Sequence, residues 1–270
     1  MRGTAAKFFR DRGPHLAAMI AYFALLSFVP LVFLALALLG LAAPANASSY
    51  LVTELKRAFP GSSVGSIVKV VREVQRHAAT LGIIGGVVLL WTSLSLFSVL
   101  ESAFNIVYGR PNRSFLRGKG LAIGLMLGSL VTLFLGLLVG TAGYDILKHH
   151  ADGFISNGYV AYTLSVLVSL LGVFAFLLSI YYVLPTVELS MREVLPGAIS
   201  ASIVLEASFQ ILPLYLRLEK HVVAAQAFGG PVLLLVWLYV MANVIVFGAE
   251  LNSSSRARER ALEETAAGLA

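Results

Sequence analysis

The chain contains no cysteine among its 270 residues, and charged residues make up only 13% of it. Without cysteine, disulfide bonds, thiolate metal sites and cysteine nucleophiles are excluded. Soluble domains carry about 25% charged residues, roughly twice as many. Because 58% of the residues are hydrophobic and the mean hydropathy is +0.86, the composition predicts a polytopic membrane protein rather than a soluble one.

Motifs that would support catalysis are also missing. The five histidines lie in flanks or loops between apolar runs, and no pair has metal-binding spacing on a helix. There is no GxSxG motif and no Walker A loop, which disfavours a serine hydrolase and excludes ATP hydrolysis by this chain. We therefore expect no catalytic residue, no metal and no cofactor, and we expect that the protein is not an enzyme.

Long apolar runs are abundant. A transmembrane helix needs about 20 predominantly apolar residues, and six runs approach or exceed that length. They cover residues 16–43, 81–108, 120–143, 158–184, 197–216 and 229–251. They predict an all-α fold with six transmembrane helices in a single membrane domain, residues 1–252. The first run is much longer than the roughly 7 to 15 residues of a signal-peptide core, which favours an uncleaved span.

Residues 44–80 form the one extended polar stretch between spans. Pro60-Gly61 divides it into two predicted helices, and the second has an apolar stripe at Val64, Ile67, Val68, Val71 and Val74. The ordinary explanation of such amphipathic helices is burial of the stripe against the outer ends of the spans. A lid or an element lying on the lipid surface is the alternative.

Lysine and arginine predict how the spans are oriented. The side that holds both termini carries 12 of these residues, whereas the short loops on the other side carry three. The insert 44–80 adds five on that other side, but long translocated segments weigh less in the rule. The positive-inside rule therefore places both termini and the charged tail 253–270 in the cytoplasm and the insert 44–80 outside. The same asymmetry explains the net charge of +6, so we expect membrane lipids as partners and no nucleic acid.

Few polar residues fall within the spans, where a charged side chain costs about 2.5 to 3.5 kcal/mol on insertion scales. Glu206 lies deepest, in the fifth span, and Gln210 follows one turn later on the same face. A buried unpaired carboxylate is costly, which favours a position facing a cavity. Pro30, which should kink the first span or free a carbonyl there, and Tyr22 are further candidates for a substrate path, although tyrosines near span ends usually anchor the interface.

A second set of polar residues lies near the cytoplasmic ends of two spans. Glu101 precedes Asn105 at the end of the second span, and Glu250 precedes Asn252 at the end of the sixth. Their similar placement predicts a shared polar layer at that face. A gate or proton-linked site is one interpretation. Hydrogen bonding between helices, with contacts to nearby arginines, is at least as well supported, and it favours Glu250 as a polar lock between helices.

Small residues recur at every fourth position of the third span. Gly124, Gly128, Gly136 and Gly140 belong to this row, which would let another helix backbone approach closely. Helix packing is the default interpretation, and a groove kept clear for a substrate is the alternative.

Several segments together resemble the YihY / virulence factor BrkB family of bacterial inner-membrane proteins. They are AYFALLSFVPL (21–31), LWTSLSLFSVLESAFNIVYG (90–109), YYVLP (181–185), LPGAISA (195–201) and GGPVLLLVWLYVMANVIVFGAELN (229–252). The resemblance implies a six-span bundle in the inner membrane and a role in the cell envelope. Members were once labelled ribonuclease BN, a label that the missing metal-ligand and acid–base clusters argue against. No catalytic residues come with the resemblance.

Two functions remain open. The first is a transporter, an exporter or flippase for an envelope lipid or a small amphipathic solute. The second is a scaffold that does not transport and that organises envelope partners through residues 44–80 or the basic loop 109–119. A homo-oligomer or an envelope protein partner is compatible with either.

Overall fold

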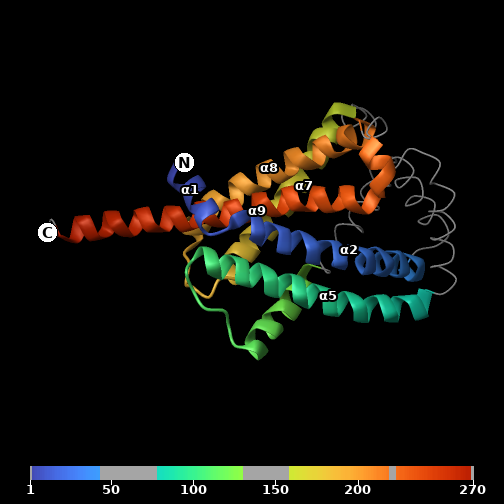
Figure 1. Cartoon of the computed structure of the whole chain (residues 1–270), viewed down its shortest axis with the longest axis horizontal. Helices are drawn as coiled ribbons and strands as arrows, with labels where there is room; N and C mark the ends of the chain where they lie inside the picture. Colours follow the sequence, from blue (N-terminus) through green and yellow to red (C-terminus); the bar gives the residue numbers. More distant parts are fainter. Residues whose placement is uncertain (1, 43–77, 130–157, 219–222, 269–270) are drawn as a thin grey trace. The chain divides into compact units, whose positions relative to one another are not determined.

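The computed structural model describes residues 2–42, 78–129, 158–218 and 223–268. The insert 44–80 lies outside the described residues apart from its last residues, 78–80. The named helices are α1 (Arg2–Arg10), α2 (Gly13–Ala42), α5 (Ala78–Val107), α7 (Gly158–Val183), α8 (Met191–Leu218) and α9 (Val223–Gly268) (Figure 1). Residues 115–129 form a further helix, and no strand occurs in the described ranges.

Four helical stretches in these ranges are long and apolar enough to cross a membrane: Gly86–Val107, Val166–Val183, Met191–Ile211 and Leu234–Ala257. The structure therefore supports an all-α, multi-pass membrane protein. The other two predicted spans are not in this set. The run 16–43 is helical in α2 but contributes only the shorter apolar stretch Gly13–Phe28, and residues 130–143 lie outside the described part.

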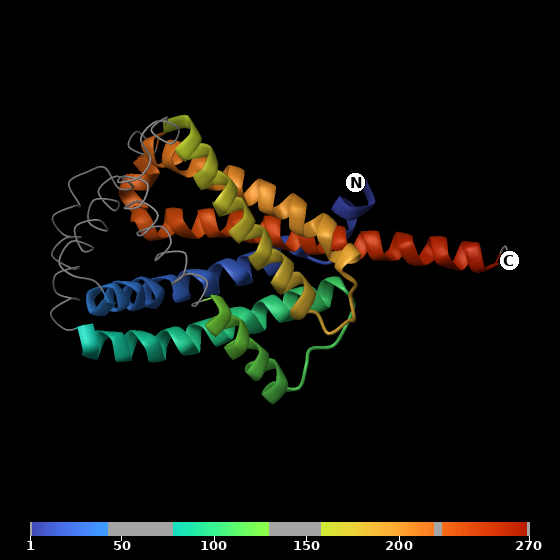
Figure 2. The ribbon, with the colours of Figure 1, turned by 180° about the vertical axis from the view of Figure 1, so that it is seen from behind.

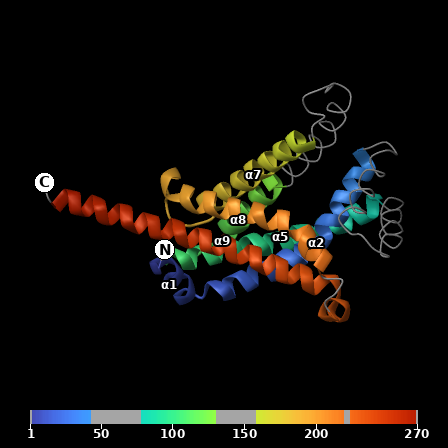
Figure 3. The ribbon, with the colours of Figure 1, turned by 90° about the horizontal axis from the view of Figure 1, so that it is seen from above.

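Helix boundaries follow the apolar runs closely for α5 and α7 but not for α8 and α9. The sequence interpretation starts the fifth span at Pro196-Gly197, whereas α8 begins at Met191. The reason is a capping box: the Ser190 amide donates to Glu193 Oε2 (2.6 Å), and the Glu193 amide donates to Ser190 Oγ (3.3 Å). Helix α9 begins at Val223 rather than residue 229 and runs to Gly268, so the tail belongs to the same helix as the spanning stretch Leu234–Ala257 (Figure 3).

The chain divides into two compact units, Met1–Ala21 with Phe97–Ala270, and Tyr22–Leu96. In the first, called unit 1, α8 packs against both α7 and α9, and α1 packs against α9 (Figures 1 and 2). Its core includes the fully buried side chains of Phe104, Leu177, Ile180 and Val246. The second, unit 2, exposes Trp91 and Ile83, as expected for apolar side chains that contact lipid tails.

Four segments that are far apart in sequence meet at one end of unit 1. Lys7 of α1 bonds both the end of α5 and Glu250 of α9, and Arg113 bonds the end of α7. The four segments are α1, the basic loop 109–119, the chain that follows α7 and the C-terminal part of α9.

A disulfide between α1 and α9 should form readily if this arrangement holds in the membrane. Thr4 Oγ1 lies 3.2 Å from Ser254 Oγ, close enough for a bond between sulfurs after a small adjustment. Because the chain has no native cysteine, oxidation of a Thr4→Cys/Ser254→Cys protein in native membranes should give one crosslinked peptide, measured by mass spectrometry. The pair Phe9→Cys/Ser254→Cys is the control, since Phe9 is exposed on α1. Equal crosslinking of both pairs would contradict the arrangement.

Candidate functional site

The Lys7 ammonium joins α1 to the ends of α5 and α9. It donates hydrogen bonds to Glu250 Oε2 (2.6 Å), Asp11 Oδ2 (2.7 Å) and the Val107 carbonyl oxygen (2.7 Å). The Glu250 side chain is 0% exposed, whereas Lys7 is 21% exposed. Glu250 is thus a fully buried carboxylate paired with a cation from the N-terminal helix, an arrangement in which loss of either partner leaves the other uncompensated.

A tight turn holds α1 in place for this contact. Arg12 has a φ of 58°, in the left-handed region, and Gly13 follows it. A Cβ on Gly13 would lie 2.3 Å from the Phe8 ring, so only glycine allows the chain to fold back there. The Phe8 ring packs edge-on against Phe247 of α9, with centroids 5.8 Å apart. The turn and the ring contact together position Lys7 over Glu250.

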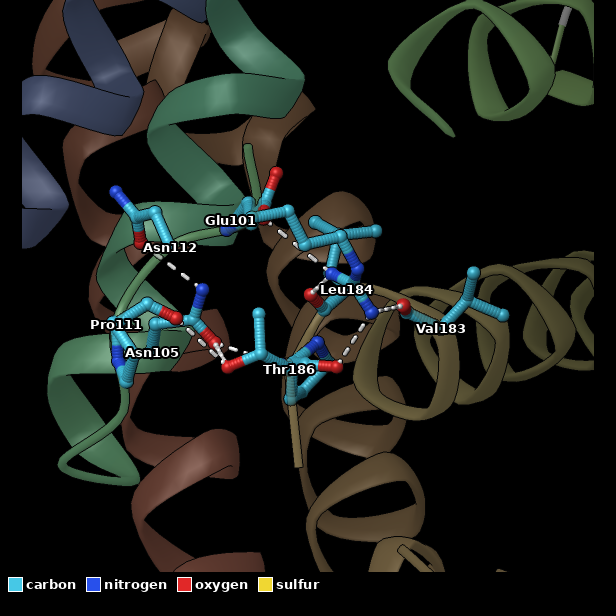
Figure 4. A network of polar contacts seen from close by, with 9 residues as sticks. Glu101, Asn105, Pro111, Asn112, Val183, Leu184 and Thr186 are labelled. Carbon is cyan, nitrogen blue, oxygen red and sulfur yellow. Dashed lines mark hydrogen bonds and ion pairs between the residues drawn. The ribbon is translucent and has the colours of Figure 1, made fainter. Parts of the chain in front are cut away.

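Arg113 binds the C-terminal end of α7. Its guanidinium donates to the carbonyl oxygens of Val183 (3.1 Å) and Pro185 (2.8 Å) and also to that of Leu184 (Figure 4). Glu101 Oε1 accepts from the Arg113 amide (3.1 Å) and from Nη1 (3.4 Å). Carbonyl oxygens at a helix end have no hydrogen-bond donor inside the helix. Arg113 donates to these oxygens, and it also neutralises the buried carboxylate of Glu101.

Asn105 makes a second connection between the same segments. Its Oδ1 accepts from the Thr186 amide (2.8 Å), and its Nδ2 donates to Asn112 Oδ1 (3.0 Å) (Figure 4). The Thr186 hydroxyl donates either to Asn105 Oδ1 (3.1 Å) or to the Pro111 carbonyl (2.9 Å). Asn105 is fully buried, so its amide fixes the 110–113 turn and the chain after α7 against the end of α5.

Asn252 marks a close crossing of α8 and α9. Its Oδ1 accepts a hydrogen bond from the Gly197 amide at 2.6 Å. A Cβ on Gly197 would lie 2.1 Å from the Gly248 carbonyl, and one on Gly248 would lie 2.3 Å from the Tyr181 hydroxyl. That hydroxyl donates to the Ile245 carbonyl at 2.7 Å. Only glycine fits at both positions, because backbone and side-chain oxygens occupy the space.

Arg256 extends the polar contacts one turn beyond Asn252. Its Nε lies 3.1 Å from Glu193 Oε1, and its Nη2 donates to the Glu188 carbonyl at 2.9 Å. The Tyr108 hydroxyl is buried close to these charges. Burial raises the pKa of the Tyr108 phenol, with Arg256 acting in the opposite direction and Glu193 and Glu250 adding to the rise.

The four residues predicted to form a polar layer are thus all buried at one end of unit 1, and each bonds another segment. Their hydrogen bonds run to the N-terminal helix, the 110–113 turn, the chain after α7 and the start of α8. We use "polar layer" for the predicted residues and their main partners: Glu101, Asn105, Glu250, Asn252, Lys7, Arg113, Thr186 and Gly197.

Glu206 lies apart from this layer, deeper along α8. It follows Gly197 by nine residues, about 14 Å at 1.5 Å per residue. Its side chain is 5% exposed. Ser169 Oγ of α7 donates to Glu206 Oε2 at 2.7 Å, and Gln210 Nε2 donates to Oε1 at 2.8 Å. The structure therefore brings Glu206 and Gln210 together, as predicted, and adds Ser169 as a third member of the cluster. The two donors, Ser169 and Gln210, are exposed.

The remaining predicted positions are spread over the chain. Tyr22 is exposed and Pro30 is buried in unit 2, where α2 continues as a helix through the proline. Built Cβ atoms on Gly124 and Gly128 meet nothing within 4 Å, so the close helix approach predicted for the glycine row is not seen at these two positions. Gly136 and Gly140 lie outside the described residues.

Comparison with known proteins decides the family. The profile of the virulence factor BrkB family matches residues 4–268, nearly the whole chain. The chain belongs to the virulence factor BrkB family. The resemblance drawn from the sequence motifs is therefore confirmed.

Two relatives of this BrkB-family chain are named membrane proteins and a third is named ribonuclease-like. A UPF0761 membrane protein of Aromatoleum aromaticum is 28% identical, with 94% of this chain and 63% of that protein covered. A UPF0761 membrane protein of Pseudomonas aeruginosa is 26% identical, covering 97% and 64%. YfkH of Bacillus subtilis, named ribonuclease-like, is 25% identical, covering 93% of each. The chain thus spans less than two thirds of the two UPF0761 proteins, and no solved structure matches it.

Some residues of the BrkB-family chain that organise these contacts could not be identified from the sequence pattern alone. In the sequence, Lys7 and Arg113 contribute only to the count of positive charges, and no motif marks Thr186 or Ser169. The spacing of Lys7 and Asp11 by four residues is a usable signal, as is the Ser-x-x-Glu pattern before α8. The partners of Arg113 are backbone carbonyls, which carry no sequence signal.

Proposed function

We propose that the protein is a transporter of the bacterial inner membrane that exports or flips an envelope lipid or a small amphipathic solute without hydrolysing ATP. The observation that supports this most is the Glu206 cluster. A carboxylate deep in a spanning helix costs about 2.5 to 3.5 kcal/mol on insertion scales, and its hydrogen bonds to Ser169 and Gln210 offset only part of that cost.

The geometry of the cluster favours contact with a passing molecule over a purely structural role. Glu206 is buried beneath Ser169 and Gln210, which are both exposed. Polar groups thus reach the outer surface of α7 and α8 at membrane depth, where hydrocarbon is a poor neighbour for them. A polar headgroup or the polar part of an amphipathic solute would be a better neighbour for these side chains than hydrocarbon.

Orientation forms part of the proposal. The charge asymmetry supports a cytoplasmic location for both termini and hence for the polar layer. In this arrangement the polar layer holds the cytoplasmic ends of the helices together, and the Glu206 cluster lies further into the bilayer. We propose a role without catalysis.

The test is flux in proteoliposomes containing the full chain. Fluorescent phosphatidylethanolamine or phosphatidylglycerol reports flipping through quenching from outside, and an amphipathic dye reports solute movement. We expect the wild-type protein to exceed protein-free liposomes for at least one probe. Glu206→Ala should reduce that rate about tenfold or more, and Glu206→Gln should reduce it less because an amide keeps hydrogen bonding to Ser169 and Gln210.

Ser208→Ala is the matched control, because the Ser208 hydroxyl bonds only its own helix, at the Val204 carbonyl. This variant should transport as the wild type does. If both Glu206 variants move every probe at the wild-type rate, Glu206 is not the site. If the wild-type protein moves nothing while crosslinking from residues 62–78 captures an envelope protein, the scaffold function replaces the transporter.

A further inference from the structure

The start of helix 115–129 carries an unusual combination of exposed side chains. Leu116 is 82% exposed and Phe115 is 76% exposed, the highest values among the large apolar residues described. Arg110 and Arg117, on either side of them, are exposed as well. We use "Phe115 surface" for these four residues: Arg110, Phe115, Leu116 and Arg117.

Contacts of the first turn place this surface at the depth of the polar layer. A Cβ on Gly118 would lie 3.1 Å from Glu101 Oε2, and Lys119 Nζ donates to Ser98 Oγ of α5 at 3.1 Å. The helix therefore starts beside Glu101 and its partner Arg113. The helix that begins at residue 115 is green in Figure 2. Because the polar layer holds ion pairs at the helix ends, we infer that the Phe115 surface lies where hydrocarbon meets headgroups.

The charge of this region is strongly positive. Between Glu101 and Asp145 the sequence contains no acidic residue, and Arg113 is already paired with Glu101. Arg110, Arg117 and Lys119 add three further positive charges. The Lys119 ammonium lies over the Phe115 ring, 5.7 Å from its centroid, so positive charge extends directly above the exposed aromatic side chain.

We propose that the Phe115 surface binds an anionic phospholipid of the surrounding bilayer. The phosphate is bound by Arg110 and Arg117, and an acyl chain packs along Phe115 and Leu116. Charge complementarity selects this occupant, because each basic residue near an anionic membrane surface contributes about 1 kcal/mol. A second copy of the chain is disfavoured, since it would bring three more cations against the same surface.

The experiment measures lipid binding to the full-length protein in detergent by native mass spectrometry. The probes are phosphatidylglycerol, phosphatidylcholine and, as a competitor, inorganic phosphate. We expect Arg110→Gln/Arg117→Gln to weaken phosphatidylglycerol binding by about 30-fold, roughly 5-fold for each charge. Phosphatidylcholine binding should be weaker and should not change. Phe115→Ala/Leu116→Ala should weaken both lipids while all charges remain.

A matched control removes the same charge elsewhere. Arg10→Gln/Arg12→Gln changes two exposed arginines in the N-terminal segment and should alter phosphatidylglycerol binding less than twofold. Arg110→Lys/Arg117→Lys should keep most of the binding. That result would show that the Gln pair weakens binding through lost charge and not through misfolding. The proposal is overturned if both Gln pairs weaken binding equally, if millimolar phosphate displaces the lipid completely, or if Phe115→Ala/Leu116→Ala converts a dimer to a monomer.

Discussion

Replacing Lys7 by methionine is expected to lower the free energy of unfolding by about 3 to 5 kcal/mol, the range seen when one partner of a buried ion pair is removed. Methionine keeps most of the packing volume but cannot bond Glu250, whose side chain is 0% exposed. The Val107 carbonyl would lose its bond to the ammonium as well. The measurement is equilibrium unfolding in mixed micelles of a mild detergent and SDS.

Two comparisons separate the ion pair from other effects of this change. Arg10→Met alters a residue of the same helix whose side chain is 74% exposed, and it should change stability by about 0.5 kcal/mol or less. The double variant Lys7→Met/Glu250→Gln should recover a large part of the loss, because the uncompensated buried charge is then gone. A double variant less stable than Lys7→Met alone would show that Glu250 depends on other partners.

The membrane character and the family of this protein could be predicted from the sequence because both depend on long apolar runs and ordered motifs. Helix α7 fits its run to within a residue, since Pro185 ends it. The start of α8 was missed because its first turn, with Arg192 and Glu193, is polar, and a capping box rather than apolar periodicity determines it.

Burial of the polar residues could be anticipated, but their partners could not. Glu206 and Gln210 are four residues apart, so helical geometry alone predicts their contact. The pairing of Glu250 with Lys7 joins residues 243 positions apart, and that of Asn252 with the Gly197 amide joins positions 55 apart. Such contacts depend on which helices are neighbours. Gly197 and Gly248 depend on helix neighbours in the same way, because a larger side chain at either position is excluded only by the close packing of neighbouring helices.

Replacing Arg113 is the second change with a large expected effect. Its guanidinium contacts Glu101 and the carbonyls of three residues that end α7. Arg113→Ala leaves the buried Glu101 carboxylate without its cation, although the amide of residue 113 still donates to it. The carbonyls at the end of α7 lose their guanidinium donors as well, so we expect a loss of about 3 to 5 kcal/mol. Arg113→Lys should recover only a minor part, because an ammonium is a compact charge that lacks the planar fork needed to span separate acceptors.

Arg117→Lys provides the control for that substitution, since Arg117 is exposed on the same segment. It should leave unfolding unchanged within about 0.5 kcal/mol. Hydrogen–deuterium exchange gives a local readout: in Arg113→Lys the amides of residues 184–190 should exchange faster, whereas those of α9 should not change. Because the Thr186 amide is held by Asn105, a segment that remained protected in Arg113→Lys would mean that Asn105 alone fixes the end of α7 to α5.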